Sequence, residues 1–308
     1  MMDSPFNKEQ KSLLPNTQFG ARPFLAERFQ HLQAAEFHHI ELQPLSPVLG
    51  ALVSGVSLAK STTNEVLQEL IRARLLYRVL FFRDQEITSD QHTAFASRFG
   101  PIEEHPFLKN KEDHADVIEF EKSETEVGAE NVWHSDVSWR EVPSLGSILR
   151  AKEIPPFGGD TMFSDTIAAY ACLDDDTKKQ LDGLRAINDF TQTFGRRMSE
   201  AQLLEMQKMY PAVSHPVVRT IPETGEKGIY VNRFFTRHIE GMSSEKSENL
   251  LEFLYRQMEF PEFQYRFQWQ KNSVAFWDNR MVQHYAVNDY WPMGRVMERV
   301  TIIGERPI

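Results

Sequence analysis

The order of apolar and polar positions predicts a chain of many short strands with a few helices between them. Residues 67–76 have helical spacing, residues 77–85 form an apolar strand closed by a turn, and Thr88 or Ser89 can cap a helix that ends at Gly100. Further strands are expected within 40–56 and at 117–120, 132–139, 146–152, 161–163, 228–232, 273–277 and 295–303. Further helices are expected at 166–172, 175–181 and 243–257.

This pattern indicates a mixed α/β fold that is mainly β. The strands are separated by glycine and proline turns and do not alternate regularly with helices, which favours a sandwich or jelly roll over a doubly wound sheet. Residues 1–36 are polar, contain Pro5, Pro15 and Pro23 and show no period, so we expect a tail or short irregular arm there. Residues 37–308 are then expected to form a single domain with flanking helices.

Composition narrows the class of partner. The 34 basic and 44 acidic residues give a formal net charge of −10, which repels a phosphate backbone and argues against nucleic acid. No apolar run reaches the roughly 18 residues of a membrane span, so we expect no membrane partner. Cys172 is the only cysteine, which excludes an intramolecular disulfide and fits the reducing cytoplasm, our expected location.

A candidate metal site begins in the segment "NVWHSDVSW". On an extended chain His134 and Asp136 point to the same face and form a two-residue clamp. His114 and Asp116 repeat the same spacing, so the pattern alone does not choose between the two pairs. The third candidate ligand is His284, which follows a β-rich run and a turn. Two histidines and one carboxylate suit an iron oxygenase that binds a 2-oxo acid and O2, and they equally suit a zinc hydrolase.

Two arginines beyond His284 favour the oxygenase. Arg295 and Arg299 are four residues apart on an expected strand and so face the same way. A buried guanidinium binds carboxylates bidentately, so Arg295 is a candidate for the distal carboxylate of 2-oxoglutarate and Arg299 for the anion of the substrate. Thr161 offers a hydroxyl that can share the co-substrate carboxylate. The alternative for Arg295 is a surface ion pair with a nearby glutamate, Glu298 or Glu305.

Four segments, "WHSDVSW", "KEIPPFGGDT", "FWDNRMVQHYAVNDY" and "RVMERVTIIGERP", resemble the taurine dioxygenase/TfdA-type family of 2-oxoglutarate-dependent dioxygenases, and the likeness extends over about residues 38–307. The resemblance implies a double-stranded β-helix, a cupin-like jelly roll, in a homo-oligomer, dimer or tetramer. It implies that His134, Asp136 and His284 bind Fe(II), that Thr161 and Arg295 bind 2-oxoglutarate, and that O2 is consumed while succinate and CO2 are released.

The resemblance also addresses the substrate. Positions that match the family's contacts to a sulfonate are His105, the backbone of Val137, and Arg299, so a small anionic substrate is expected. Leu108 stands where family members that bind taurine have a tyrosine, which disfavours taurine itself. Phe235 matches an aromatic residue on the substrate side and, with Leu108, indicates a more apolar pocket.

A second departure lies near an expected asparagine, where the chain has Glu130 with Asn131 adjacent. The expected reaction is therefore hydroxylation of an alkyl or aryl sulfonate or of a sulfate ester. The alternatives are the same chemistry on a carboxylate such as an aryloxyacetate, or a metal-dependent hydrolase on the same barrel.

Overall fold

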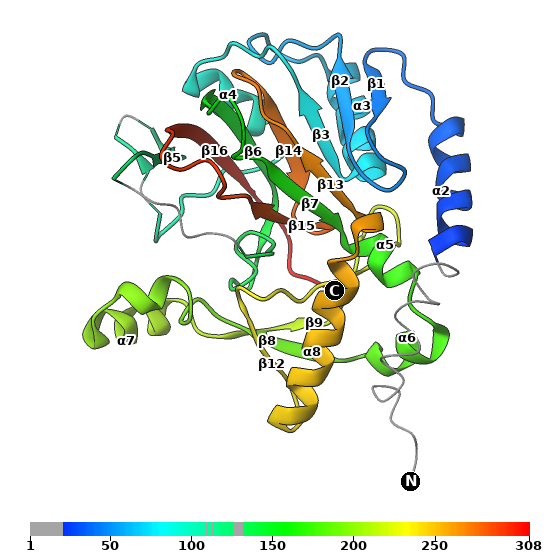
Figure 1. The fold of residues 1–308 in the computed structure, drawn as a ribbon, viewed down its shortest axis with the longest axis vertical. Helices are drawn as coiled ribbons and strands as arrows, with labels where there is room; N and C mark the ends of the chain where they lie inside the picture. Colours follow the sequence, from blue (N-terminus) through cyan, green and yellow to red (C-terminus); the bar gives the residue numbers. More distant parts are fainter. Residues whose placement is uncertain (1–20, 109, 113, 126–131) are drawn as a thin grey trace.

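The computed structural model describes residues 21–308, apart from 109, 113 and 126–131. Its largest element is an eight-stranded sheet in which all neighbouring strands are antiparallel except β2 and β3 (Figure 1). In spatial order the strands are β1 (Glu41–Pro44), β2 (Ala51–Ser54), β3 (Val79–Phe82), β14 (Val274–Asp278), β6 (Ser144–Glu153), β16 (Arg295–Ile303), β5 (His114–Lys122) and β4 (Asn110–Lys111).

Three smaller sheets complete the β structure. The sheet that carries part of the candidate site has the order β13 (Gln264–Phe267), β7 (Thr161–Asp165) and β15 (Val282–Ala286). A second has the order β12 (Thr236–Ile239), β8 (Arg185–Asn188) and β9 (Val213–Pro216), and a hairpin joins β10 (Val218–Thr220) to β11 (Lys227–Ile229). The prediction of a mixed, mainly β fold with flanking helices is confirmed.

The large sheet is buried on both faces. Along β14, Val274 and Phe276 pack with α3 (Asn64–Tyr77) and α4 (Ser89–Ala96), whereas Ala275 and Trp277 pack toward β7 and β15. Alternate residues of a strand point to opposite faces, so a strand covered on both sides is apolar at every position. The candidate site lies on the second of these faces.

The remaining helices flank the sheets. They are α5 (Thr166–Ala171), α6 (Asp175–Leu181), α7 (Glu200–Met209) and α8 (Ser244–Met258), with short 3₁₀ turns η2 (Phe194–Arg197) and η3 (Pro261–Phe263). In Figure 1, α7 stands at the edge of the molecule, away from the large sheet. Within the described part of the chain no helix has both the length and the apolar character that crossing a membrane requires.

Local signals placed most elements correctly. Thr88, one of the two N-cap residues that the sequence predicted, caps α4 and forms a capping box with Gln91, although the helix ends at Ala96 rather than Gly100. An analogous box between Ser199 and Gln202 begins α7, which was not predicted. Its side chains are all at least partly exposed, and only Leu203 and Met206 pack against a core cluster, so the apolar pattern by which surface helices are usually recognised is weak.

Two local predictions were wrong. Part of the expected irregular arm is helical, since α2 (Ala21–Ala34) is anchored by Arg28, whose buried guanidinium donates to the carbonyls of Val48 and Leu76. The expected strand at 132–139 is absent, because the chain pairs only at His134 and then turns, with Val137 in the left-handed region at φ 58°. In both places contacts distant in sequence override the local pattern.

Candidate active site

The two histidines are brought together by the backbone. His134 forms an isolated antiparallel pair with His284 on β15, through hydrogen bonds of 3.1 Å from the His134 N–H and 2.8 Å from the His284 N–H. Their ring centroids are 4.2 Å apart. The pairing thus fixes the separation of two residues that are far apart in the sequence.

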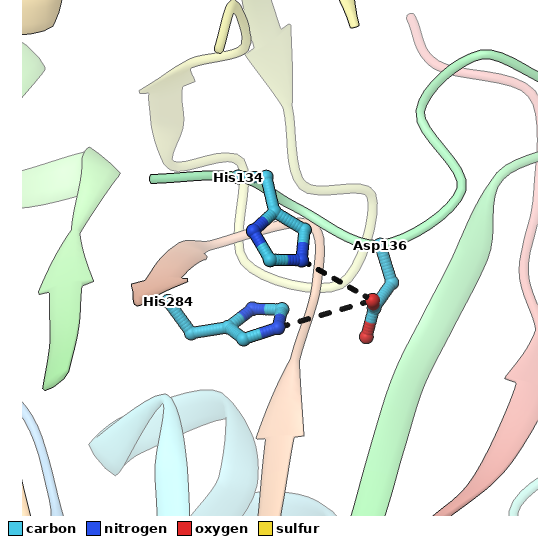
Figure 2. A group of neighbouring side chains, drawn as sticks. All are labelled: His134, Asp136 and His284. Carbon is cyan, nitrogen blue, oxygen red and sulfur yellow. Dashed lines mark ion pairs between the residues drawn. The ribbon is translucent and has the colours of Figure 1, made fainter. Parts of the chain in front are cut away.

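The turn after His134 adds the carboxylate. Asp136 Oδ1 lies 3.7 Å from His134 Nε2 and 3.8 Å from His284 Nε2, and Figure 2 shows both rings directed toward that oxygen. One ligand atom from each of the three residues lies within 4.8 Å of the others, and no other such group occurs among the described residues. Two imidazole nitrogens and one carboxylate oxygen fit a divalent transition metal bound on one face.

The protonation states also fit a metal. The Nδ1 of His134 lies 2.8 Å from the carbonyl oxygen of Val132, a contact that fixes the tautomer with the Nε2 lone pair inward. Burial lowers the pKa of His284 to about 3. Burial by itself would raise the pKa of Asp136, but Arg299, then His284 and His134, hold it well below its usual range. His284 and Asp136 are therefore deprotonated near neutral pH, and the neutral form of His134 presents its Nε2 lone pair to the site.

The triad opens into a cavity of about 790 Å³. Arg295 and Arg299 on β16 both line it, as expected from their spacing, and both are less than 10% exposed. The expected alternative of a surface ion pair for Arg295 is wrong, because Glu298 pairs with lysines and Arg150, and Glu305 with Arg219 and Arg280.

The Arg295 side of the cavity fits a planar anion. The Nε and Nη2 atoms of Arg295 are buried without a hydrogen-bond partner among the described residues. Thr161 is paired opposite Ala286, two residues along β15 from His284, and its hydroxyl accepts a hydrogen bond of 3.0 Å from Trp269. Gly159 borders the site at φ +69°, where an added Cβ would lie 3.2 Å from the Arg295 side chain. Thr161 keeps its own O–H to donate.

A second set of donors lies beside Asp136. Arg299 donates from Nη1 to Asp136 Oδ1 at 2.7 Å, while its Nε is buried and unpaired within the described structure. His105 accepts the N–H groups of Phe107 and Leu108 on Nδ1, each at 3.2 Å, and burial lowers its pKa to about 3. A neutral His105 that accepts on Nδ1 carries its proton on Nε2.

The backbone at Val137 completes this donor set. The positive φ of Val137 is rare for a β-branched residue, and its N–H has no partner among the residues described. Like His105 and Arg299, it lines the cavity. The three groups that the sequence suggested for an anion therefore lie around one cavity.

The rest of the wall is largely apolar. Leu108 and Phe235 line it as expected. Other apolar side chains that line the cavity were not predicted from the sequence, among them Phe107, Phe120, Met198, Met206 and Phe234. No local pattern singles out these residues, because they come from β5, from separate loops and from α7.

Two further predictions concern other residues. His114, the competing candidate, sits on β5 and pairs with exposed Asp90 at 3.6 Å, so the second His-x-Asp motif is not at the site. Glu130 and Asn131, where the sequence departs from family members that bind taurine, lie outside the described residues.

The known proteins to which this chain is similar in sequence agree with the chemistry that the site supports. The chain is 35% identical over 274 residues to an alkylsulfatase of Acinetobacter baylyi, covering 86% of each chain. It is 30% identical to an alpha-ketoglutarate-dependent sulfate ester dioxygenase of Pseudomonas putida, covering 87% of this chain and 91% of the relative. It is also 32% identical to the alpha-ketoglutarate-dependent 2,4-dichlorophenoxyacetate dioxygenase of Cupriavidus pinatubonensis, covering 78% and 90%.

The comparison of structures gives the same result as the comparison of sequences. The crystal structure of a taurine dioxygenase from Burkholderia xenovorans matches with a TM-score of 0.76 and 35% identity, covering 88% of this chain and 91% of that one. Residues 41–301 match the family described as taurine catabolism dioxygenase TauD, TfdA family. The chain belongs to this family and is a 2-oxoglutarate-dependent dioxygenase.

Proposed function

We propose that this enzyme binds Fe(II) through His134, Asp136 and His284 and hydroxylates a small anionic substrate with an apolar body, releasing succinate and CO2. The observation that carries the proposal is that these three side chains and two buried arginines with unpaired N–H groups line one cavity. Fe(II), once bound, supplies the reaction with O2.

Arg295 and Thr161 are proposed to hold 2-oxoglutarate. A guanidinium with two unpaired buried N–H groups is complementary to a carboxylate, which binds such a fork bidentately. The hydroxyl of Thr161, already accepting from Trp269, can donate its proton to the same carboxylate. With the distal carboxylate held here, the 2-oxo acid end reaches toward His284, two residues along the neighbouring strand.

His105, the N–H of Val137 and Arg299 are proposed to hold the substrate anion. All are donors, and Arg299 already contacts Asp136, so an anion bound by it lies next to the metal ligands. The first carbons after the anionic group are then the ones nearest the metal. This geometry favours hydroxylation close to the head group.

The cavity suits a larger substrate than taurine. Its volume of about 790 Å³ is in the range of sites for drug-sized ligands. Beyond the anion donors, phenylalanine, methionine and leucine side chains line much of the wall, and the polar side chains there include Arg196, Arg197 and Glu205. An alkyl or aryl sulfate ester or sulfonate is the substrate class that we propose, supported by the names of two relatives.

A carboxylate substrate such as an aryloxyacetate is the second candidate, because one relative is named for 2,4-dichlorophenoxyacetate and the wall is rich in aromatic side chains. A metal-dependent hydrolase is not favoured, because the family matched by this chain and the relatives reported above are dioxygenases.

The test begins without oxygen. Fe(II) and 2-oxoglutarate are added to metal-free protein, and the expected result is the weak visible charge-transfer band of a chelated 2-oxo acid. Candidate sulfate esters, sulfonates and aryloxyacetates are then added, followed by O2, and succinate is measured. Hydroxylation at the carbon bearing a sulfate ester gives an unstable adduct that collapses to aldehyde and sulfate, so inorganic sulfate is a second product to assay.

Asp136→Ala is the matched control, since it removes one ligand, and it is expected to show no band. If folded wild-type protein gives no band, the metal and co-substrate assignment is wrong. If the band forms but only aryloxyacetates yield succinate, the second candidate replaces the first.

Four further features are also proposed: the β-helix architecture, the single domain, the oligomeric state and the cellular location. We propose that the large sheet and the β13–β7–β15 sheet are the two halves of a double-stranded β-helix, within one domain over residues 37–308. The two sheets pack together where the rings of Trp277 on β14 and Phe163 on β7 meet, with their centroids 5.6 Å apart, and this contact supports the arrangement. The homo-oligomeric state, to be measured by light scattering, and the cytoplasmic location rest on family resemblance and cysteine content alone.

A further inference from the structure

Asn279 lies behind the metal ligands and uses its whole amide. It is 1% exposed and follows β14 in the turn toward β15. Its Oδ1 accepts from the Asp136 N–H at 3.1 Å and from Trp277 Nε1 at 2.8 Å. Its Nδ2 donates to the hydroxyls of Ser144 and Ser147, each at 3.0 Å. A buried amide with every donor and acceptor filled is held in one orientation.

Three of these four partners lead to Asp136. The first is the N–H of Asp136 itself. The Ser144 hydroxyl donates to the Asp136 carbonyl oxygen at 3.1 Å, and the Ser147 hydroxyl donates to Asp136 Oδ2 at 2.7 Å. Asn279 and the two serines on β6 therefore bind the backbone on both sides of the Asp136 Cα atom and one of its carboxylate oxygens.

The turn that carries Asn279 is itself fixed. The Asn279 N–H donates to the carbonyl oxygen of Leu145 at 2.9 Å. The preceding residue, Asp278, forms ion pairs with Arg280 at 2.9 Å and with Arg74 at 3.2 Å, and all three side chains are nearly inaccessible to solvent. The amide is thus presented from a rigid support.

We infer that Ser147 and Asn279 are positioning residues that allow only Oδ1 of Asp136 to face the metal. Ser147 holds Oδ2 on the side of β6, whereas Oδ1, which accepts from Arg299, is the oxygen nearest to the Nε2 atoms of both histidines and keeps a second lone pair for the metal. A carboxylate held in this way binds a metal through one oxygen and leaves coordination positions open for 2-oxoglutarate and O2. This inference rests on the proposed function, because it takes Asp136 to be a ligand.

The test measures metal binding instead of turnover. Metal-free wild-type protein, Asp136→Ala and Ser147→Ala are titrated with Co(II), whose visible absorption reports both affinity and coordination geometry. Binding by the wild type and its loss in Asp136→Ala test the proposed site independently of the inference. Ser147→Ala is expected to bind Co(II) about 10- to 100-fold more weakly, as is usual when a partner of a ligand is removed, and with an altered spectrum.

Two variants separate positioning from simple packing. Ser135→Ala is the matched control, because Ser135 is also buried beside Asp136 but donates to the Val282 carbonyl at 2.8 Å; its Co(II) affinity is expected to stay within about threefold of wild type. Ser147→Thr keeps the hydroxyl and is expected to restore both affinity and spectrum.

Asn279→Ala is expected to weaken Co(II) binding at least as much as Ser147→Ala, and the double variant no more than Asn279→Ala alone, because the residues act in one network. If Asn279→Ala does not fold, the comparison of Ser147→Ala with Ser147→Thr still tests the inference. Wild-type affinity and spectrum in Ser147→Ala, or an equal loss in Ser135→Ala, would overturn the inference while leaving the proposed metal site intact.

Discussion

Replacing Arg295 by alanine is expected to abolish most of the affinity for 2-oxoglutarate. Arg295 is 8% exposed, and burial lowers its pKa, an effect that Tyr290 and Asp160 offset only in part. Its Nε and Nη2 have no partner in the described structure, and the Tyr290 ring centre is 5.9 Å from the guanidinium carbon. A bound carboxylate supplies the missing counter-charge.

The magnitude follows from the kind of contact. Truncating one member of a buried, hydrogen-bonded charge pair costs about 2 to 4 kcal/mol, which is about 30- to 700-fold in the dissociation constant. Arg295→Lys keeps the charge but loses the fork and is expected to fall between wild type and alanine. Arg299→Ala, on the same face of β16, is expected to change 2-oxoglutarate affinity far less and to weaken binding of the anionic substrate instead.

The assay is anaerobic titration of Fe(II)-loaded protein with 2-oxoglutarate, followed by the charge-transfer band. Thermal unfolding gives an independent readout, since a ligand at 100 times its dissociation constant stabilises the fold by about 2.7 kcal/mol. At equal ligand concentration the stabilisation should fall to about 0.9 kcal/mol or less in Arg295→Ala. Retention of near wild-type affinity in Arg295→Ala, or an equal loss in Arg299→Ala, would refute the reasoning.

Three more predictions follow from particular contacts. Trp269→Phe removes the donor to Thr161 and is expected to weaken 2-oxoglutarate binding about 2- to 10-fold; an unchanged titration would count against this role. Met206→Trp puts a larger side chain on the part of the cavity wall that α7 contributes, and so leaves less room for a long alkyl chain. It is expected to raise KM for decyl sulfate at least about tenfold more than for butyl sulfate, and equal effects on both substrates would contradict it. Burial lowers the pKa of His92 from 6.5 to about 4. The unfolded chain therefore binds a proton at this residue more readily than the folded protein does, so the free energy of unfolding is unaffected above pH 6.5 and declines by about 1.4 kcal/mol per pH unit as the pH falls from 6.5 to 4. In urea unfolding His92→Gln should flatten that decline, and an identical slope would disprove the assignment.

The candidate ligands were accessible from the sequence, but for a reason that was partly wrong. His134 and Asp136 were expected to share a face of one strand, whereas the structure has a single bridge followed by a turn. The spacing still placed them together, because two residues in a tight turn stay as close as two on a strand. Choosing this pair over His114 and Asp116 required the resemblance of the surrounding segments.

What the sequence by itself determined is the set of elements with strong local signals and the family motifs around His134, Thr161, His284 and Arg295. The continuous apolar runs of β3 and β14 and the N-cap of α4 belong to this set, since they depend on neighbours along the chain. Tertiary structure alone decided which side chains meet. The orphaned nitrogens of Arg295, the capping of Asp136 by Ser147, and the wall built from α7 and distant loops depend on strand register and packing between segments far apart, and no local pattern encodes these contacts.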